Sequence, residues 1–181
     1  MELIENGDWN AVGKILGDLA KKIETAGADV LIMTSNAAHK VFLEIEQAIN
    51  IPILHIADPT GDVMQKREIK KVRLLGTKVT MTEDFYQRRL KDRYNIEVLV
   101  PKKGEQKLLH KIIFDELTCG QIHDNSRKSL IEIIDRLSSK GCEGVILGCT
   151  KVTLLIEQKD TKVPLLDTTR LHAKAAVDAD I

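Results

Sequence analysis

Apolar residues follow two different spacings in the first third of the chain. Between Asp8 and Gly27 they recur every three or four positions, which predicts an amphipathic helix that Asp8 caps and Gly27 ends. Short, continuously apolar runs follow at 30–33 and 52–56. Runs of this kind are typical of strands that are covered on both faces. A helix is expected between the two strands, at about 37–49.

The alternation of strands and helices continues to the end of the chain. Further strands are predicted at 72–76, 96–100, 145–147 and 163–166, and further helices at about 82–94, 104–118 and 125–139. Because helices separate the strands, right-handed crossovers and parallel sheets are expected. The sequence therefore predicts an α/β protein with a first domain at 1–68, a second domain at 69–168 and a C-terminal helix at 169–181.

Two segments of the chain repeat one pattern. Residues 26–36 and 140–150 each contain a helix stop, an acidic residue, an apolar strand and a polar tip. The alignment places Ser35 over Cys149. Ligands of parallel α/β folds bind at the carboxyl ends of strands, so these two residues are expected to be equivalent and to face one another across one cleft. The alternative is that strand–turn–helix units simply resemble each other.

Composition and charge narrow the class of protein. The 181 residues carry 27 basic and 27 acidic side chains, and 43% of them are hydrophobic. This balance is typical of a folded globular protein and predicts neither a nucleic-acid partner nor a membrane surface. Without a long apolar segment or a signal sequence, the expected location is the cytoplasm.

The three cysteines differ in their surroundings. Cys119, Cys142 and Cys149 are odd in number and lack Cys-x-x-Cys spacing, so neither a disulfide scaffold nor a metal site is expected. Cys149 lies where a strand gives way to a helix, and helix amides and the neighbouring Lys151 would favour its thiolate. A packing role for Cys149 is equally compatible with the sequence. Cys119 and Cys142 are interpreted as structural.

Several segments together resemble one enzyme family. They are TSNAAHK at 34–40, LLGT at 74–77, FDEL at 114–117, GVILGCT at 144–150 and PLLDT at 164–168. In this order they resemble the aspartate/glutamate racemase family, within the broader group that includes hydantoin racemases. The resemblance implies two similar three-layer α/β/α domains with parallel sheets, a homodimer, and a small-molecule amino-acid substrate bound between the domains. It also implies racemisation without pyridoxal phosphate or another cofactor.

The resemblance assigns roles to five residues. Cys149 matches the catalytic cysteine of the second domain, and Ser35 matches its partner in the first. The two would remove and return the α-proton on opposite faces of the substrate. Asn36, Thr77 and Thr150 match residues that line the substrate carboxylate. Acidic amino acids are the substrates that the resemblance implies.

The chain also departs from the family pattern. Ser35 and Ala37 replace the usual cysteine and threonine of the first motif, and Lys151 replaces a glutamate. A serine is a poor base without an activating neighbour, and His39 is either such a neighbour or a packing residue. The family's first strands precede the helix that opens this sequence, so the first domain is expected to be truncated. A fragment and a natural short form are both compatible with this.

These departures leave two functions open. The first is an amino-acid racemase, an isomerase that uses Cys149 and Ser35. The alternative is an inactive or truncated racemase-like protein that at most binds a small carboxylate.

Overall fold

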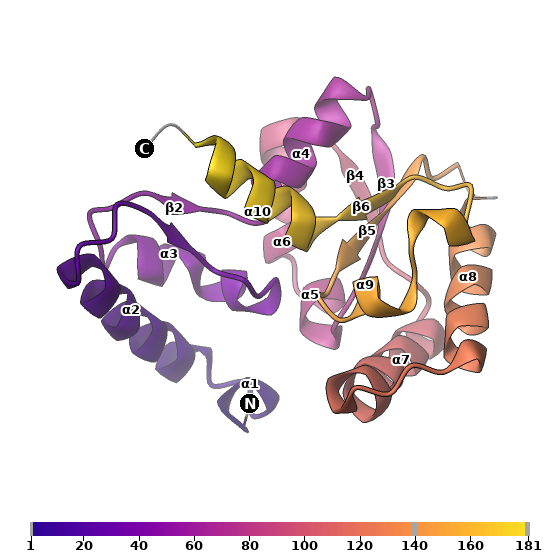
Figure 1. Cartoon of the computed structure of the whole chain (residues 1–181), viewed down its shortest axis with the longest axis horizontal. Coiled ribbons are helices and arrows are strands. Elements are labelled where there is room, and N and C mark those ends of the chain that lie inside the picture. The colour runs from indigo at the N-terminus through magenta and orange to yellow at the C-terminus, as the bar shows by residue number, and fades with distance from the viewer. Residues whose placement is uncertain (1, 139–140, 180–181) are drawn as a thin grey trace.

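The computed structural model describes residues 2–138 and 141–179. Its strands form two parallel sheets (Figure 1). A two-stranded sheet pairs β1 (Leu31–Ile32) with β2 (Ile53–Leu54). A four-stranded sheet has the order β4-β3-β5-β6, with β3 (Lys71–Gly76), β4 (Glu97–Leu99), β5 (Gly144–Gly148) and β6 (Leu165–Asp167). The predicted α/β class with parallel sheets is confirmed.

Helical segments connect the strands. Before β3 these are α1 (Glu2–Glu5), α2 (Trp9–Thr25), the 3₁₀ turn η1 (Ala37–Val41), α3 (Phe42–Glu46) and α4 (Ala57–Lys66). After β3 they are α5 (Lys78–Thr82), α6 (Phe85–Tyr94), α7 (Lys103–Lys111), the π segment η2 (Ile112–Glu116), η3 (Leu117–Cys119), α8 (Asp124–Ser138), α9 (Val152–Leu155), η4 (Gln158–Asp160) and α10 (Thr168–Asp178).

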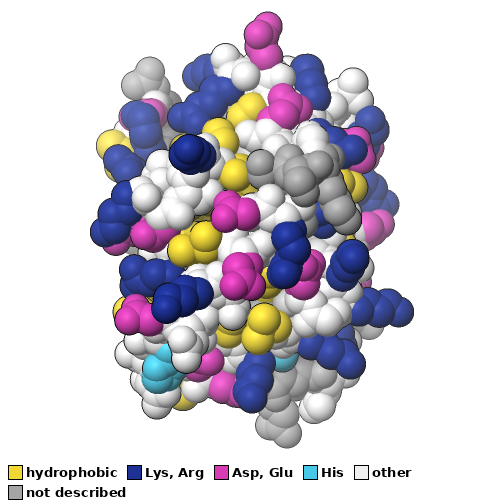
Figure 2. Space-filling model, turned by 90° about the vertical axis from the view of Figure 1, so that its right-hand side faces the viewer, with side chains coloured by type: hydrophobic (Ala, Val, Ile, Leu, Met, Phe, Trp, Pro, Cys, Tyr) yellow, Lys and Arg dark blue, Asp and Glu magenta, His cyan; other side chains and the backbone are white. Residues whose placement is uncertain are grey.

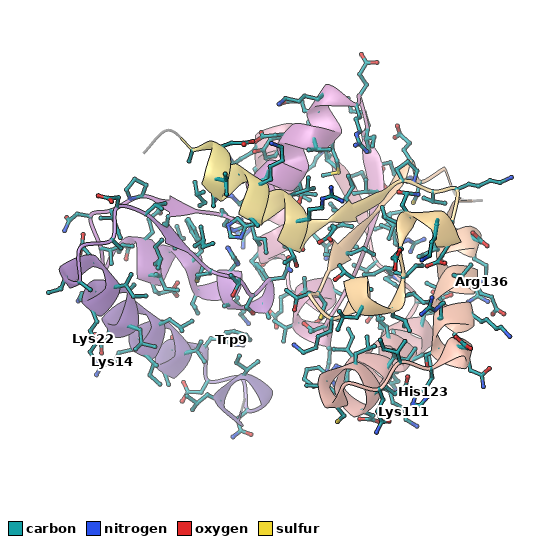
Figure 3. All side chains as sticks on the ribbon, in the orientation of Figure 1. Trp9, Lys14, Lys22, Lys111, His123 and Arg136 are labelled. Atoms are coloured by element: carbon teal, nitrogen blue, oxygen red, sulfur yellow. The ribbon has the colours of Figure 1, made fainter. Side chains whose placement is uncertain are left out.

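The first predicted helix forms as expected. The Asp8 carboxylate accepts a hydrogen bond from the amide of Ala11 at 3.0 Å, which caps α2. Gly27 follows the helix with a φ of 91°, a backbone conformation that favours glycine. At the start of α2, the ring of Trp9 (Figure 3) faces the ammonium group of Lys40 at 4.5 Å.

Three predicted helices are divided in the structure, and the one expected at 104–118 is α-helical only as far as Lys111, before η2 and η3. The segment expected at 37–49 begins as a 3₁₀ turn and becomes α-helical only at Phe42, because Val41 departs from helical geometry with a φ of −107° and a ψ of 28°. The segment expected at 82–94 breaks at Glu83, whose ψ of 150° is extended. Apolar spacing could not show the breaks at Val41 and Glu83, because helical periodicity continues across both.

Side chains of the four-stranded sheet alternate between two hydrophobic cores. On β3, Val72 and Leu74 contact one core, whereas Leu75 contacts the other. On β5, Ile146 joins the first core and Leu147 the second. This alternation has the period of two that strands impose. The first core includes residues of α4 and α6 and the second includes residues of α7 and α8, so helices cover both faces of this sheet.

The two-stranded sheet is fastened to the rest of the molecule by contacts that are distant in sequence. Helix α10 packs against α4. From α10, the His172 ring donates a hydrogen bond from Nε2 to the Leu54 carbonyl at 2.9 Å. An ion pair joins Lys40 to Glu83 at 3.0 Å. The domain boundaries at 68 and 168 remain predictions.

Candidate active site

Adjacent strands of the larger sheet end at the same level. The register pairs Gly76 of β3 with Gly148 of β5, so Thr77 and Cys149 follow neighbouring strand ends. Cys149 is buried, with 7% of its surface exposed, and belongs to the second core. The Thr77 hydroxyl accepts from the Thr80 amide at 3.4 Å, which caps α5. Two of the five predicted residues therefore share one edge of the sheet.

Two glycines allow these strand ends to approach closely. A Cβ atom on Gly76 would lie 2.7 Å from the Gly148 carbonyl oxygen, and one on Gly148 would lie 3.1 Å from the Leu75 carbonyl oxygen. The same atom on Gly148 would also lie 2.6 Å from a methyl group of Leu74. No side chain fits at Gly76 without moving the backbone of β5, whereas at Gly148 the shortest contact is with a Leu74 methyl group and the backbone contact is longer.

We expect Gly76→Ala to destabilise the fold and to displace the end of β5 that precedes Cys149, because the added methyl group overlaps the Gly148 carbonyl oxygen. Overpacking of this kind costs about 1–3 kcal/mol. Urea denaturation of the variant and of Gly104→Ala measures the difference. Gly104 is a control without a clash because a Cβ there meets nothing within 4 Å, and each variant is compared with the wild type because alanine by itself stabilises helix α7 by about 0.5–1 kcal/mol. Equal stability of the two variants would contradict the expected clash.

The tip of the first half is held by a histidine. His39 Nδ1 donates a proton to the Ser35 carbonyl at 2.8 Å, and its Nε2 accepts from the Ile56 amide at 3.0 Å. The carbonyl can only accept and the amide can only donate, so these bonds fix the tautomer. Both ring nitrogens are occupied by backbone groups. Of the two roles left open for His39, the structural one fits these contacts, and the exposed Ser35 hydroxyl receives no activating base from it.

A buried hydrogen-bonded bridge connects the two halves. Asn36 Nδ2 donates to Thr168 Oγ1 at 3.0 Å, and that hydroxyl donates to the Leu147 carbonyl at 2.9 Å. Asn36 is 4% exposed, and its Oδ1 has no hydrogen-bond partner. A buried acceptor without a partner costs free energy unless a ligand or water supplies a donor. This oxygen is therefore a buried acceptor that lacks a protein donor at the junction.

Three histidines surround the first turn of α4. The rings of His39 and His55 lie 4.5 Å apart, and those of His39 and His172 lie 6.0 Å apart. His55 Nδ1 accepts from the Ala57 amide at 3.1 Å. Together, His39 and His55 satisfy two amides at the start of α4 that have no partner within the helix. Burial lowers the pKa of all three histidines, and it lowers the pKa of His39 to about 4.

The remaining predicted residues lie beside Cys149. Thr150 is half-buried, and its carbonyl accepts from the Thr153 hydroxyl at 2.8 Å. Helix α9 has only four residues, and the amide of Val152 donates to the carbonyl of Cys149 rather than to its sulfur. Cys142 is buried, which agrees with its structural interpretation, whereas Cys119 is exposed and its structural role remains a prediction.

A surface hollow has Leu147 and Asp167 in its lining, near the carboxyl ends of β5 and β6. It has a volume of about 580 Å³, runs beside the edge strand β6, and is bordered by the cations Arg67, Lys159 and Arg170. None of the five predicted residues lines it. Within residues 2–138 and 141–179, no three metal-ligating side chains are grouped so as to hold an ion, and no helix is both long and apolar enough for a membrane span.

Charge is mixed on the surface of the second half. Figure 2 shows acidic and basic side chains interspersed over the face beyond α8, without a large field of one sign. This mixture agrees with the formal net charge of zero. A broad basic face of the kind that binds nucleic acid is not seen in this view.

Comparison with known proteins assigns the family. The model of the Asp/Glu/Hydantoin racemase family matches residues 1–176. The chain belongs to this family. The family is one of racemases, and the protein is accordingly grouped with the isomerases whose substrates are small molecules such as amino acids. The resemblance seen in the sequence is confirmed.

Individual relatives agree with this assignment. The chain is 40% identical to a Yersinia pestis protein assigned as an Asp/Glu racemase, with a TM-score of 0.91, covering 98% of this chain and 77% of the other. An aspartate racemase homologue from Pyrococcus horikoshii OT3 is 37% identical, with a TM-score of 0.85 and coverages of 98% and 78%. The broad specificity amino-acid racemase RacX of Bacillus subtilis is 26% identical, with coverages of 94% and 73%.

Sequence reasoning missed Thr168, His55 and His172 as parts of the site. Thr168 ends the PLLDT segment that carries the resemblance, which was a usable signal. The two histidines had none, because they are 117 positions apart in the chain and only the fold brings each of them beside His39.

Proposed function

We propose that the protein is a cofactor-independent racemase of aspartate or glutamate in which Cys149 and Ser35 are the two acid/base residues. The bridge from Asn36 through Thr168 to Leu147 is the observation that carries this proposal. Asn36 follows Ser35, and Leu147 precedes Cys149 by two residues, so the bridge joins the backbones of both strand tips. This connection supports the proposal because racemisation needs one acid/base group on each face of the α-carbon, and the bridge links the two strand ends that would carry them.

The reaction consists of two proton transfers. The Cys149 thiolate takes the α-proton, and the electron pair left on the carbon delocalises into the substrate carboxylate. The Ser35 hydroxyl then gives a proton to the opposite face, and solvent reprotonates the serine and deprotonates the cysteine. The reverse reaction exchanges the two roles.

Polar groups at the junction would bind the substrate. The unpartnered Asn36 Oδ1 can accept a hydrogen bond from the α-ammonium group. The Thr77 hydroxyl already accepts from an amide, which leaves its own proton for the substrate carboxylate or Thr80 Oγ1. Thr150 stands next to Cys149. Donors of this kind stabilise the negative charge that develops on the carboxylate.

Specific observations favour the alternative, a binding protein without turnover. Cys149 is largely buried in a hydrophobic core, and both nitrogens of His39 are occupied by backbone groups. A serine without a base reacts slowly.

Self-association as a homodimer is part of the proposal, supported by the open outer edges of β1 and β2.

Proton NMR in heavy water tests the proposal. Purified protein is incubated with L- and D-aspartate and L- and D-glutamate, and both the α-proton signal and the enantiomer ratio are followed. We expect loss of the α-proton from both enantiomers together with racemisation. Exchange with retained configuration would show that only one of the two residues works. Thermal stabilisation by the amino acids without any exchange would establish the binding protein instead.

A further inference from the structure

We propose that Thr168 is a positioning residue that sets the two strand tips against each other and fixes the orientation of the Asn36 amide. The inference rests on the proposed function and deepens it, because nothing in the motifs assigned a role to this residue. Thr168 touches neither of the acid/base residues directly. It acts through its two hydrogen-bond partners, one in each half of the molecule.

The hydroxyl of Thr168 has one directional arrangement. Its only proton goes to the Leu147 carbonyl, which cannot donate, at 2.9 Å. Its oxygen therefore accepts from Asn36 Nδ2 at 3.0 Å. The side chain is fully buried, so water does not compete for either bond. A single hydroxyl thus determines which atom of the Asn36 amide is left without a protein partner.

The backbone of Thr168 is fixed as well. Asp167 precedes it as the N-cap of α10 and accepts from the amides of Thr169 and Arg170 at 3.0 and 3.1 Å. One turn later, His172 donates to the Leu54 carbonyl of the smaller sheet. The start of α10 is consequently hydrogen-bonded to both sheets. The Thr168 hydroxyl therefore helps to fix the position of one sheet relative to the other.

Loss of the hydroxyl would release both restraints. The Asn36 amide could then rotate by half a turn and present a donor in place of the Oδ1 acceptor. The Ser35 tip would lose its buried connection to the strand that carries Cys149. Misplacing a reacting group by about 1 Å can lower turnover about 10²-fold. The effect should fall on kcat more than on KM.

Thr168→Val and Thr168→Ser test this role. Valine has nearly the same shape but no hydroxyl, whereas serine keeps it. We expect kcat for racemisation to fall about 10- to 100-fold in Thr168→Val, with a smaller change in KM, and to return to within about threefold of wild type in Thr168→Ser. Thr25→Val is the matched control, because the exposed Thr25 hydroxyl also donates to a backbone carbonyl, that of Lys21, remote from the site. An unchanged kcat in Thr168→Val, or failure of serine to rescue it, would overturn the proposal.

A second measurement separates this inference from the proposed function. If the wild-type protein shows no α-proton exchange, the proposed racemase function is refuted, and Thr168 can then have no catalytic effect. The bridge would still be judged by a double-mutant cycle of Asn36→Ala and Thr168→Val in urea denaturation. Coupled partners should destabilise less together than the sum of the single changes. Additive effects, or an Asn36 side-chain amide signal that Thr168→Val leaves unshifted in ¹⁵N NMR, would refute the bridge itself.

Discussion

Replacing Cys149 by alanine is expected to abolish racemisation while leaving the fold intact. General acid/base groups contribute about 10²- to 10⁴-fold to rates, and Ser35 alone lacks an activating base. The alanine variant should therefore lose turnover by at least about 10²-fold. The loss of one sulfur atom from a packed core costs only about 1 kcal/mol, comparable to the loss of one methylene group. Circular dichroism measures the fold and its stability, and the heavy-water exchange assay measures turnover.

Cys142 provides a matched control for this experiment. It is 8% exposed against 7% for Cys149, and it precedes β5 whereas Cys149 follows it. The two residues are thus buried to a similar extent and flank the same strand, β5, at its opposite ends. We expect Cys142→Ala to retain turnover with a similar small loss of stability. Equal activity of the two variants would remove Cys149 from the mechanism.

Mild acid is expected to destabilise the protein through its buried histidines. The pKa of His39 falls from its usual 6.5 to about 4 because the ring is buried, and that of His55 is lowered by burial and by the neighbouring His39. Between pH 4 and pH 6.5, His39 binds more protons in the unfolded chain than in the folded one. The contribution of His39 to stability is complete above pH 6.5 and is lost as the pH falls toward 4.

The size of the effect follows from the pKa. A fall from 6.5 to about 4 corresponds to about 3 kcal/mol for His39 alone. Protonation would also replace an acceptor at Nε2 by a donor facing the Ile56 amide. Other charged groups near the histidines also affect their pKa values. Asp58 forms ion pairs with Arg89 and Arg93, and Arg89 lowers the pKa of His39 and His55.

Urea denaturation at pH 7.5, 6 and 5 checks this expectation. The free energy of unfolding should fall at each step in the wild type, and the pH profile should be flatter in His39→Gln. His123 serves as the control, since it is exposed and lies on the far side of the molecule from the two-stranded sheet (Figure 3). His123→Gln should reproduce the wild-type profile. A wild-type stability that does not change between pH 7.5 and 5 would contradict the assignment.

Local patterns were sufficient to predict the elements and the family. The Asp8 cap, the helix end at Gly27 and the apolar strand predicted at 145–147 depend on neighbouring residues, and the structure confirms each, with β5 one residue longer at either end. The choice of candidate residues at the ends of strands followed from the rule that ligands of parallel α/β folds bind at the carboxyl ends of strands.

Contacts between distant residues could not be predicted in the same way. Asn36 and Thr168 are 132 positions apart, and neither residue type indicates that it will meet the other. The burial of Cys149 is likewise a property of the packed helices around it. The breaks at Val41 and Glu83 depend on backbone angles that a smooth hydrophobic period conceals.

The attachment of the smaller sheet to α10 has a consequence for biosynthesis. Strand β2 is complete by residue 54, but its fastening by His172 and that of Asn36 by Thr168 need residues that the ribosome adds more than a hundred positions later. At about 5–20 residues per second, this interval lasts several seconds or more. During that time the nascent amino-terminal half exposes its strand edges, and it is the part of the chain that a chaperone would need to shield.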